Sequence, residues 1–217
     1  MRELVPAVGD SPLTLSLVEL EDAPCLLADA DHDSLLFVVS GSGSLLLGEE
    51  RLALAPGSAA LVLAGEEAEV TADDGGIALL HARAGDEADR HAPLGRRETA
   101  VRLDEAVSAR ATGSRSYQVL FGAENGSTRV TLFAGYVPPG RAPWHFHLYD
   151  EIVWIRDGSA RLHLAEGVSD LGPGSAVRLR PRQVHIVENA SADRELSVIG
   201  IFTPAGSPSA AYLAPAP

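Results

Sequence analysis

Cysteine is nearly absent from this 217-residue chain, and long apolar runs are missing. Cys25 is the only cysteine, so no disulfide can form within the chain, which is consistent with a reducing cytoplasm. No apolar run approaches the length of a membrane span. Residues 1–22 carry acidic groups early and have no long apolar core, so we expect no signal peptide. The composition therefore indicates a cytoplasmic protein that does not enter a membrane.

Positive charge is also scarce. The chain has 17 Lys and Arg against 30 Asp and Glu, which gives a formal net charge of −13. A nucleic-acid-binding protein needs a basic face, and an anionic membrane attracts basic segments, so both kinds of partner are excluded. We expect a small-molecule partner instead. An anionic substrate is still compatible with this charge, because a metal and nearby arginines can override the overall field.

Helical periodicity is rare along the chain. Hydrophobic residues make up 46% of it, which is ample for a core, while 21 glycines and 14 prolines are scattered throughout. Short apolar stretches alternate with turn residues at a spacing of about ten residues, a pattern typical of sandwiches and barrels. The sequence therefore predicts an all-β fold.

Potential metal ligands gather in residues 139–189. His145, His147 and Glu151 lie within seven residues, and His185 follows a pattern typical of a hairpin. Side chains of an extended segment alternate between two faces, so His145 and His147 point the same way, and Glu151 has the same parity. The strand that starts near His185 could lie beside this segment in an antiparallel sheet. Three imidazoles and one carboxylate suit a divalent transition metal.

The order of these residues resembles the first sequence motif of the cupin superfamily. That motif has a glycine, five residues, His-x-His, three or four residues, a glutamate, six residues and a second glycine. Here four residues separate the first glycine from the histidine pair, and the other spacings agree. The matching positions are Gly140, His145, His147, Glu151 and Gly158.

The second cupin motif is matched with two departures. The stretch from Gly174 to His185 has the expected total length, and Asn189 falls in place. Pro181 is one residue late, and the motif's inner glycine is missing, with Arg182 and Gln183 around its position. The resemblance implies a metal held by His145, His147, Glu151 and His185, while the departures affect the turn before His185.

The first half of the chain repeats the second half at a distance of 117 residues. The segment Pro173-Gly174-Ser175-Ala176 falls on Pro56-Gly57-Ser58-Ala59 without a gap, and Gly158-Ser159 falls on Gly41-Ser42. Internal repetition of this kind indicates two copies of one structural unit. The same shift puts side chains that cannot hold a metal at the four ligand positions of the first copy, namely Ala28, Ala30, Ser34 and Ala68.

We therefore predict two tandem cupin-like jelly-roll barrels, similar to a bicupin in which only the second barrel holds a metal. The predicted divisions are residues 1–85 for the first barrel, 86–114 for a charged connecting segment, and 115–217 for the metal-binding barrel. Part of the connecting segment, residues 98–109, is compatible with either a strand or one short helix.

The predicted site would hold one divalent transition metal, since Fe, Mn, Ni, Cu and Zn all accept these ligands. Four protein ligands leave one or two positions for a small molecule. Three further residues are candidate catalytic residues by position. Tyr149 shares the parity of the ligands, Gln183 shares that of His185, and Arg141 precedes the ligands where a pocket mouth would be.

Three classes of function fit these residues. The resemblance favours a metal-dependent dioxygenase or other oxygenase that acts on a small organic molecule. A redox-neutral isomerase, cyclase, lyase or decarboxylase is the alternative, and a barrel that only binds or senses a small molecule is the third class. Cupins commonly pair through strands, so the resemblance allows a homodimer, although two fused barrels could mimic such a dimer within one chain.

Overall fold

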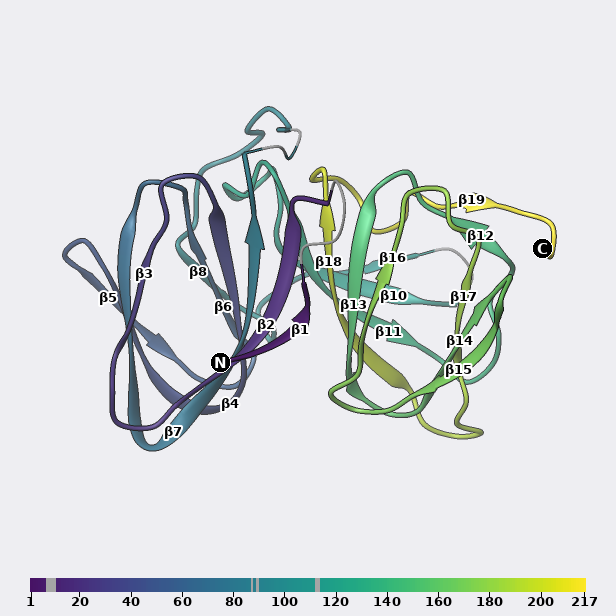
Figure 1. The fold of residues 1–217 in the computed structure, drawn as a ribbon, viewed down its shortest axis with the longest axis horizontal. Helices are drawn as coiled ribbons and strands as arrows, with labels where there is room; N and C mark the ends of the chain where they lie inside the picture. The colour runs from purple at the N-terminus through teal and green to yellow at the C-terminus, as the bar shows by residue number, and fades with distance from the viewer. Residues whose placement is uncertain (7–10, 87, 89, 112–113) are drawn as a thin grey trace.

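The computed structural model describes residues 1–6, 11–86, 88, 90–111 and 114–217. Every regular element among these residues is a β-strand. None of the described segments is a helix long and apolar enough to span a membrane. Figure 1 shows two barrel-like lobes side by side, with the N-terminal half of the chain in one and the C-terminal half in the other. The prediction of an all-β fold is confirmed.

The first lobe is built on an eight-stranded antiparallel sheet with the order β1-β2-β7-β4-β6-β8, in which β3 pairs with β7 and β5 with β4. Two long strands, β4 and β7, bend through the whole lobe and pair along most of their length. The strands are β1 (Arg2–Val5), β2 (Leu13–Leu20), β3 (Cys25–Ala28), β4 (Asp33–Leu47), β5 (Glu50–Leu54), β6 (Ser58–Val62), β7 (Glu67–Ala84) and β8 (Ala100–Arg102).

In the second lobe, the corresponding course of the chain is divided into a larger number of shorter strands. A six-stranded sheet has the order β16-β13-β18-β11-β10-β9, and two small sheets, β15-β14-β17 and β12-β19, lie beside it. The strands are β9 (Ser108–Arg110), β10 (Ser116–Phe121), β11 (Thr131–Val137), β12 (His145–Phe146), β13 (Asp150–Asp157), β14 (Ala160–Leu164), β15 (Gly167–Leu171), β16 (Ala176–Leu179), β17 (Ile186–Asn189), β18 (Leu196–Thr203) and β19 (Tyr212–Leu213).

The two lobes share one strand order, as the sequence repeat requires. The path β1-β2-β7-β4-β6 of the first lobe corresponds to β10-β11-β18-β13-β16 of the second. A shift of 117 residues places the start of β4 on the start of β13, and both ends of β5 on both ends of β15. The repeat is therefore a repeat of topology as well as of sequence.

The connecting segment contributes one strand to each lobe. β8 pairs with β6 in the first lobe, and β9 pairs with β10 in the second. Turn residues lie between them, so the stretch that the sequence left open between strand and helix contains no helix among its described residues.

An apolar core crosses the boundary between the lobes. Leu35 and Phe37 of the first lobe are packed in one buried cluster with Ile152, Trp154 and Ile201 of the second. The contacts are reciprocal, since β1 lies against β16 and its counterpart β10 lies against β6. Burial of a large apolar side chain contributes about 1.5–3 kcal/mol, so this shared cluster fixes the lobes to each other.

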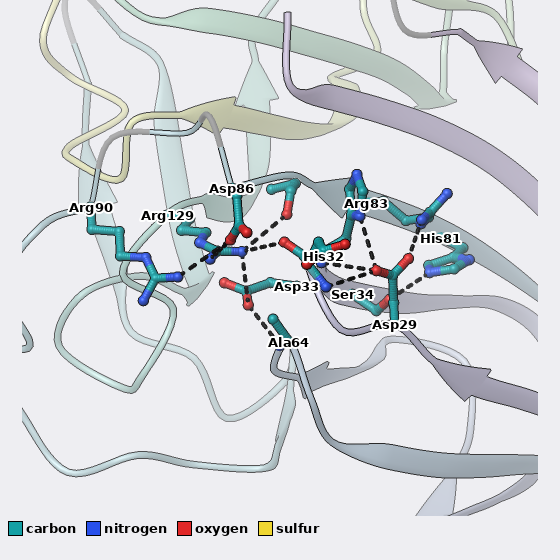
Figure 2. A network of polar contacts seen from close by, with 12 residues as sticks. Asp29, His32, Asp33, Ser34, Ala64, His81, Arg83, Asp86, Arg90 and Arg129 are labelled. Atoms are coloured by element: carbon teal, nitrogen blue, oxygen red, sulfur yellow. Dashed lines mark hydrogen bonds and ion pairs between the residues drawn. The ribbon is translucent and has the colours of Figure 1, made fainter.

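A buried arginine adds a polar link at the same boundary (Figure 2). Arg129, just ahead of β11, is 1% exposed. Its guanidinium donates to the Asp31 carbonyl oxygen at 2.9 Å and to the Asp86 carboxylate, and it lies 3.5 Å from Asp33 Oδ1. Asp33 also accepts a hydrogen bond from the Ala64 amide. A charge removed from water needs such acceptors to offset its desolvation.

A second polar pair lies inside the first lobe. Nε2 of His81 on β7 is 2.9 Å from Oγ of Ser34 on β4, and both side chains are buried. Burial lowers the pKa of His81 to about 4, and the nearby Arg83 charge acts in the same direction. The imidazole is therefore neutral over the physiological range of pH.

Replacement of Arg129 by methionine should lower the free energy of unfolding by about 3 kcal/mol, because Asp33 would keep a buried charge without its cation. Adding Asp33→Asn to the Arg129→Met variant should restore part of the lost free energy of unfolding. Urea unfolding of the wild type, both single variants and the double variant measures the coupling. A loss below about 1 kcal/mol in Arg129→Met would show that this ion pair does not hold the lobes together.

His81 should make the protein less stable in mild acid. Its pKa is about 4 in the folded state and about 6.5 in the unfolded chain, so between these values only the unfolded state gains a proton. Stability therefore falls as the pH falls through this range. In His81→Gln, the stability lost between pH 7.5 and pH 5 should be smaller by about 2 kcal/mol. Denaturant unfolding at both pH values tests this, and identical losses in the two proteins would contradict it.

Candidate metal centre

Two predicted ligands are joined by backbone pairing. His145 is the first residue of β12, and His185 directly precedes β17. The His185 amide donates to the His145 carbonyl oxygen at 2.9 Å, and the reverse hydrogen bond measures 3.3 Å. This antiparallel bridge brings together two parts of the chain that are 40 residues apart. Residues in such a pair project from the same face of a sheet, so their imidazoles come close.

The third imidazole completes the cluster. His147 lies in the link between β12 and β13, and its ring centroid is 4.8 Å from that of His185 and 5.3 Å from that of His145. One ring nitrogen from each histidine lies within 4.8 Å of the others, and all three residues are buried. The structure thus brings together the three histidines that the sequence analysis named as ligands.

Two of the imidazoles are held in a form that can bind a metal. Nδ1 of His145 is 2.9 Å from the Pro143 carbonyl oxygen, and Nδ1 of His185 is 2.8 Å from that of Gln183. A carbonyl can only accept, so Nδ1 carries the proton and Nε2 keeps its lone pair. Burial lowers the pKa of both histidines to about 4, which keeps them neutral, as metal ligation requires.

Glu151 on β13 lies beside His147 and is 4% exposed, while the group of ligand atoms within 4.8 Å of one another contains the three histidines without Glu151. Its Oε2 is 3.0 Å from Nδ1 of His147. The geometry does not make a hydrogen bond, and Nδ1 of His147 is a buried atom without a hydrogen-bond partner. Ligand atoms of one metal at about 2.1 Å lie about 3 Å apart. The orphaned nitrogen and the adjacent carboxylate oxygen therefore fit a shared metal.

These residues line one wall of a cavity of about 80 Å³. Its other walls are mainly apolar and aromatic, with Tyr117 and Phe133 in edge-to-face contact. Residues of the six-stranded sheet supply most of the lining, so the cavity lies inside the second lobe. The lining includes Val153, Leu179, Val187 and Val198.

Of the three candidate catalytic residues, Tyr149 lines the cavity. Its ring is stacked between His147, at 4.5 Å between ring centroids, and Phe202, at 4.0 Å. Burial raises the pKa of Tyr149 well above its usual value, and the Glu151 charge adds to this effect. Its hydroxyl therefore stays protonated and can donate a hydrogen bond.

Gln183 and Arg141 lie outside the cavity lining. Oε1 of Gln183 accepts a hydrogen bond from the Arg180 amide at 3.0 Å, which turns the side chain into the local loop. Arg141 is exposed, and its guanidinium lies 5.3 Å above the ring of Trp144. Neither side chain is among the residues that line the cavity of the three histidines. The parity of Gln183 with His185 and the position of Arg141 before the ligands did not predict these local contacts.

The turn before His185 is kept despite its missing glycine. Arg182, which the sequence placed around the glycine position, adopts a φ of 65°. A left-handed conformation costs a non-glycine residue about 1–2 kcal/mol. The Arg182 amide donates to the His147 carbonyl oxygen at 2.7 Å. This turn therefore ties the loop of one histidine to that of another.

Two parts of the cavity wall have no counterpart in the sequence prediction. Arg115, directly before β10, lines the cavity, as do Pro208 and Ala211 of the C-terminal segment. That segment is held where β19 pairs with β12 and where Tyr212 stacks on Phe146 at 5.4 Å. Neither region carries a motif or a regular hydrophobic pattern that could have indicated its position.

The corresponding region of the first lobe has a different content. The residues at the ligand positions are Ala28, Ala30, Ser34 and Ala68. Ser34 is bonded to His81, and an aliphatic cluster fills much of the interior. The one group of potential metal ligands found among the described residues is that of the second lobe.

Comparison with known proteins agrees with this geometry. The family model described as a cupin domain matches residues 133–202, which contain all three histidines. No curated protein sequence gives a significant match.

Solved structures share the overall fold over nearly the whole chain. A cupin 2 conserved barrel domain protein from Leptotrichia buccalis has a TM-score of 0.64 at 15% identity, covering 88% of this chain and 84% of that one. A variant of oxalate decarboxylase from Bacillus subtilis has a TM-score of 0.74 at 13% identity, covering 94% and 71%. AerE from Microcystis aeruginosa has a TM-score of 0.72 at 14% identity, covering 89% and 88%.

At these identities the likeness concerns the fold. The cupin domain match covers residues 133–202 of the second lobe, and the solved structures add a likeness in fold to the chain as a whole.

Proposed function

We propose that this protein is a metal-dependent cupin enzyme that acts on a small organic molecule in the cavity of its second lobe. The observation that carries the proposal is the set of three buried imidazole nitrogens, all within 4.8 Å of one another, on the wall of a cavity. Buried polar groups normally have hydrogen-bond partners. A buried nitrogen without one, as in His147, is accounted for if it is a ligand.

The ligands would be His145, His147, His185 and Glu151, with one divalent transition metal bound. Imidazole suits Fe, Ni, Cu and Zn, and the carboxylate extends the range to Mn. The metal would supply Lewis acidity and, if it is redox-active, the ability to activate dioxygen. The carbonyl oxygens of Pro143 and Gln183 orient two of the rings, and such supporting contacts tune metal affinity.

The remaining cavity residues would shape the reaction. Tyr149 presents a protonated hydroxyl and supports the ring of His147 by stacking. Apolar walls and the C-terminal segment with Ala211 line the cavity, and a substrate that displaces water from it would strengthen electrostatic interactions inside the site. The first lobe would act as a structural partner, so that the chain is a bicupin with one working centre.

The reaction class that we favour is oxygenation, by analogy with cupins that have three histidines and one glutamate. Redox-neutral chemistry is the alternative, and the structural likeness to an oxalate decarboxylase from Bacillus subtilis makes lyase or decarboxylase activity its leading form. A barrel that binds a small molecule without transforming it is the third class.

Metal content gives the first test. The wild type loaded with iron, manganese or zinc should retain about one metal ion per chain after desalting. His147→Ala should lower metal affinity by at least about 100-fold, because a ligand is lost, and should keep its β-sheet circular dichroism spectrum. His32→Ala, a half-exposed histidine of the first lobe, serves as the matched control. Equal metal content in the two variants would contradict the proposed ligands.

Turnover under air and under argon tests the reaction class. Metal-loaded protein is mixed with a collection of small organic acids, alcohols and ketones, and products are followed by NMR, with His147→Ala as the blank. We expect turnover in the wild type that stops when dioxygen is removed. Turnover that continues under argon would overturn oxygenation in favour of redox-neutral chemistry. Binding without product for every metal would favour the third class.

A further inference from the structure

Arg115 brings a positive charge into the cavity of the second lobe. It directly precedes β10, lines the same cavity as the three histidines and is partly buried. The chain as a whole carries a formal net charge of −13. The Arg115 guanidinium therefore places a positive charge inside a molecule whose net charge is negative. A guanidinium stays charged inside proteins.

The charge of Arg115 acts directly on the proposed metal site. Arg115 lines the same cavity as Glu151 and the three histidines, and its charge attracts the Glu151 carboxylate. By formal charges, a divalent metal, one glutamate and one arginine give the cavity about +2, since the imidazoles are neutral. An entering anion would find two cationic groups in a region of low dielectric constant.

We propose that Arg115 binds the carboxylate of the substrate, and that the cavity selects a short-chain organic acid. This inference rests on the proposed function and specifies its substrate class. Guanidinium matches a carboxylate with two parallel hydrogen bonds. The aliphatic lining by Val153, Leu179 and Val198 suits a carbon skeleton, whereas a phosphate ion needs donors on every side.

The size of the cavity limits the length of the acid. Its volume is about 80 Å³, which compares with about 150 Å³ for a cavity that takes up benzene. A carboxylate with a few carbon atoms fits these bounds. An aromatic acid would require the walls to move.

Isothermal titration of metal-loaded protein with acetate, pyruvate and malonate, and with acetamide and malonamide, tests the assignment. The wild type should bind at least one acid at least about 10-fold more tightly than the matching amide. Arg115→Gln should lose about 10- to 100-fold in affinity for that acid, with unchanged metal content. Arg115→Lys keeps the positive charge but lacks the planar guanidinium, so its affinity for the acid should lie between those of the wild type and Arg115→Gln.

The matched control is Arg110→Gln, which removes an exposed arginine of β9 and should bind the acid as the wild type does. The proposal is overturned if Arg115→Gln binds the acid normally, if the amides bind as tightly as the acids, or if inorganic phosphate binds as tightly as any acid. If Arg115→Gln does not fold, the comparison of acids with amides in metal-free wild type still tests the proposal, because no metal is then present to bind the carboxylate.

Metal analysis of the same samples separates this inference from the proposed function. Loss of acid binding in Arg115→Gln with full metal content supports the role of Arg115. If the wild type holds no metal, the proposed function fails. Preference for acids over amides in that metal-free protein would still support the anion site, and its absence would overturn it.

Discussion

The backbone pairing of His145 with His185 is the constraint on which the candidate site depends. Two hydrogen bonds, of 2.9 and 3.3 Å, join the start of β12 to the residue before β17. Without them, the third imidazole would lie on an unrelated loop, and His145 and His147 alone would offer only two ligands. The Arg182 turn reinforces this pairing through its amide bond to the His147 carbonyl oxygen, which explains why a strained residue is tolerated there.

The sequence predicted the parts of the molecule that depend on local spacing. Period-two parity put His145 and His147 on one face, the later strand pattern and the cupin resemblance added His185, and the repeat at 117 residues anticipated the common strand order. Arg115 and Arg129 escaped prediction, because neither belongs to a periodic pattern, and Arg129 meets its partners through contacts distant in sequence. Gln183 shows the opposite case. It has the same parity as His185, but its side chain does not line the cavity, because a local hydrogen bond from the Arg180 amide sets its direction.

The two lobes have the same topology but different interiors. In the first, the long strands β4 and β7 run unbroken, and aliphatic side chains such as Leu45 and Val70 fill the interior. In the second, the corresponding path is split into β13, β14, β17 and β18, and a cavity lies behind the histidines. Dense packing stabilises a domain, and a functional cavity lowers the packing density around it. The core shared by the two lobes therefore lets the densely packed first lobe stabilise the second lobe, which contains the cavity.

The central claim is that a single cation is held in the second lobe and none in the first. Anomalous diffraction from crystals of metal-loaded protein tests it most directly. The account predicts one peak within ligand distance of His145, His147 and His185, with Glu151 beside it, and no peak near Ser34 or His81. A peak inside the first lobe, or an empty histidine cluster at saturating metal, would contradict it.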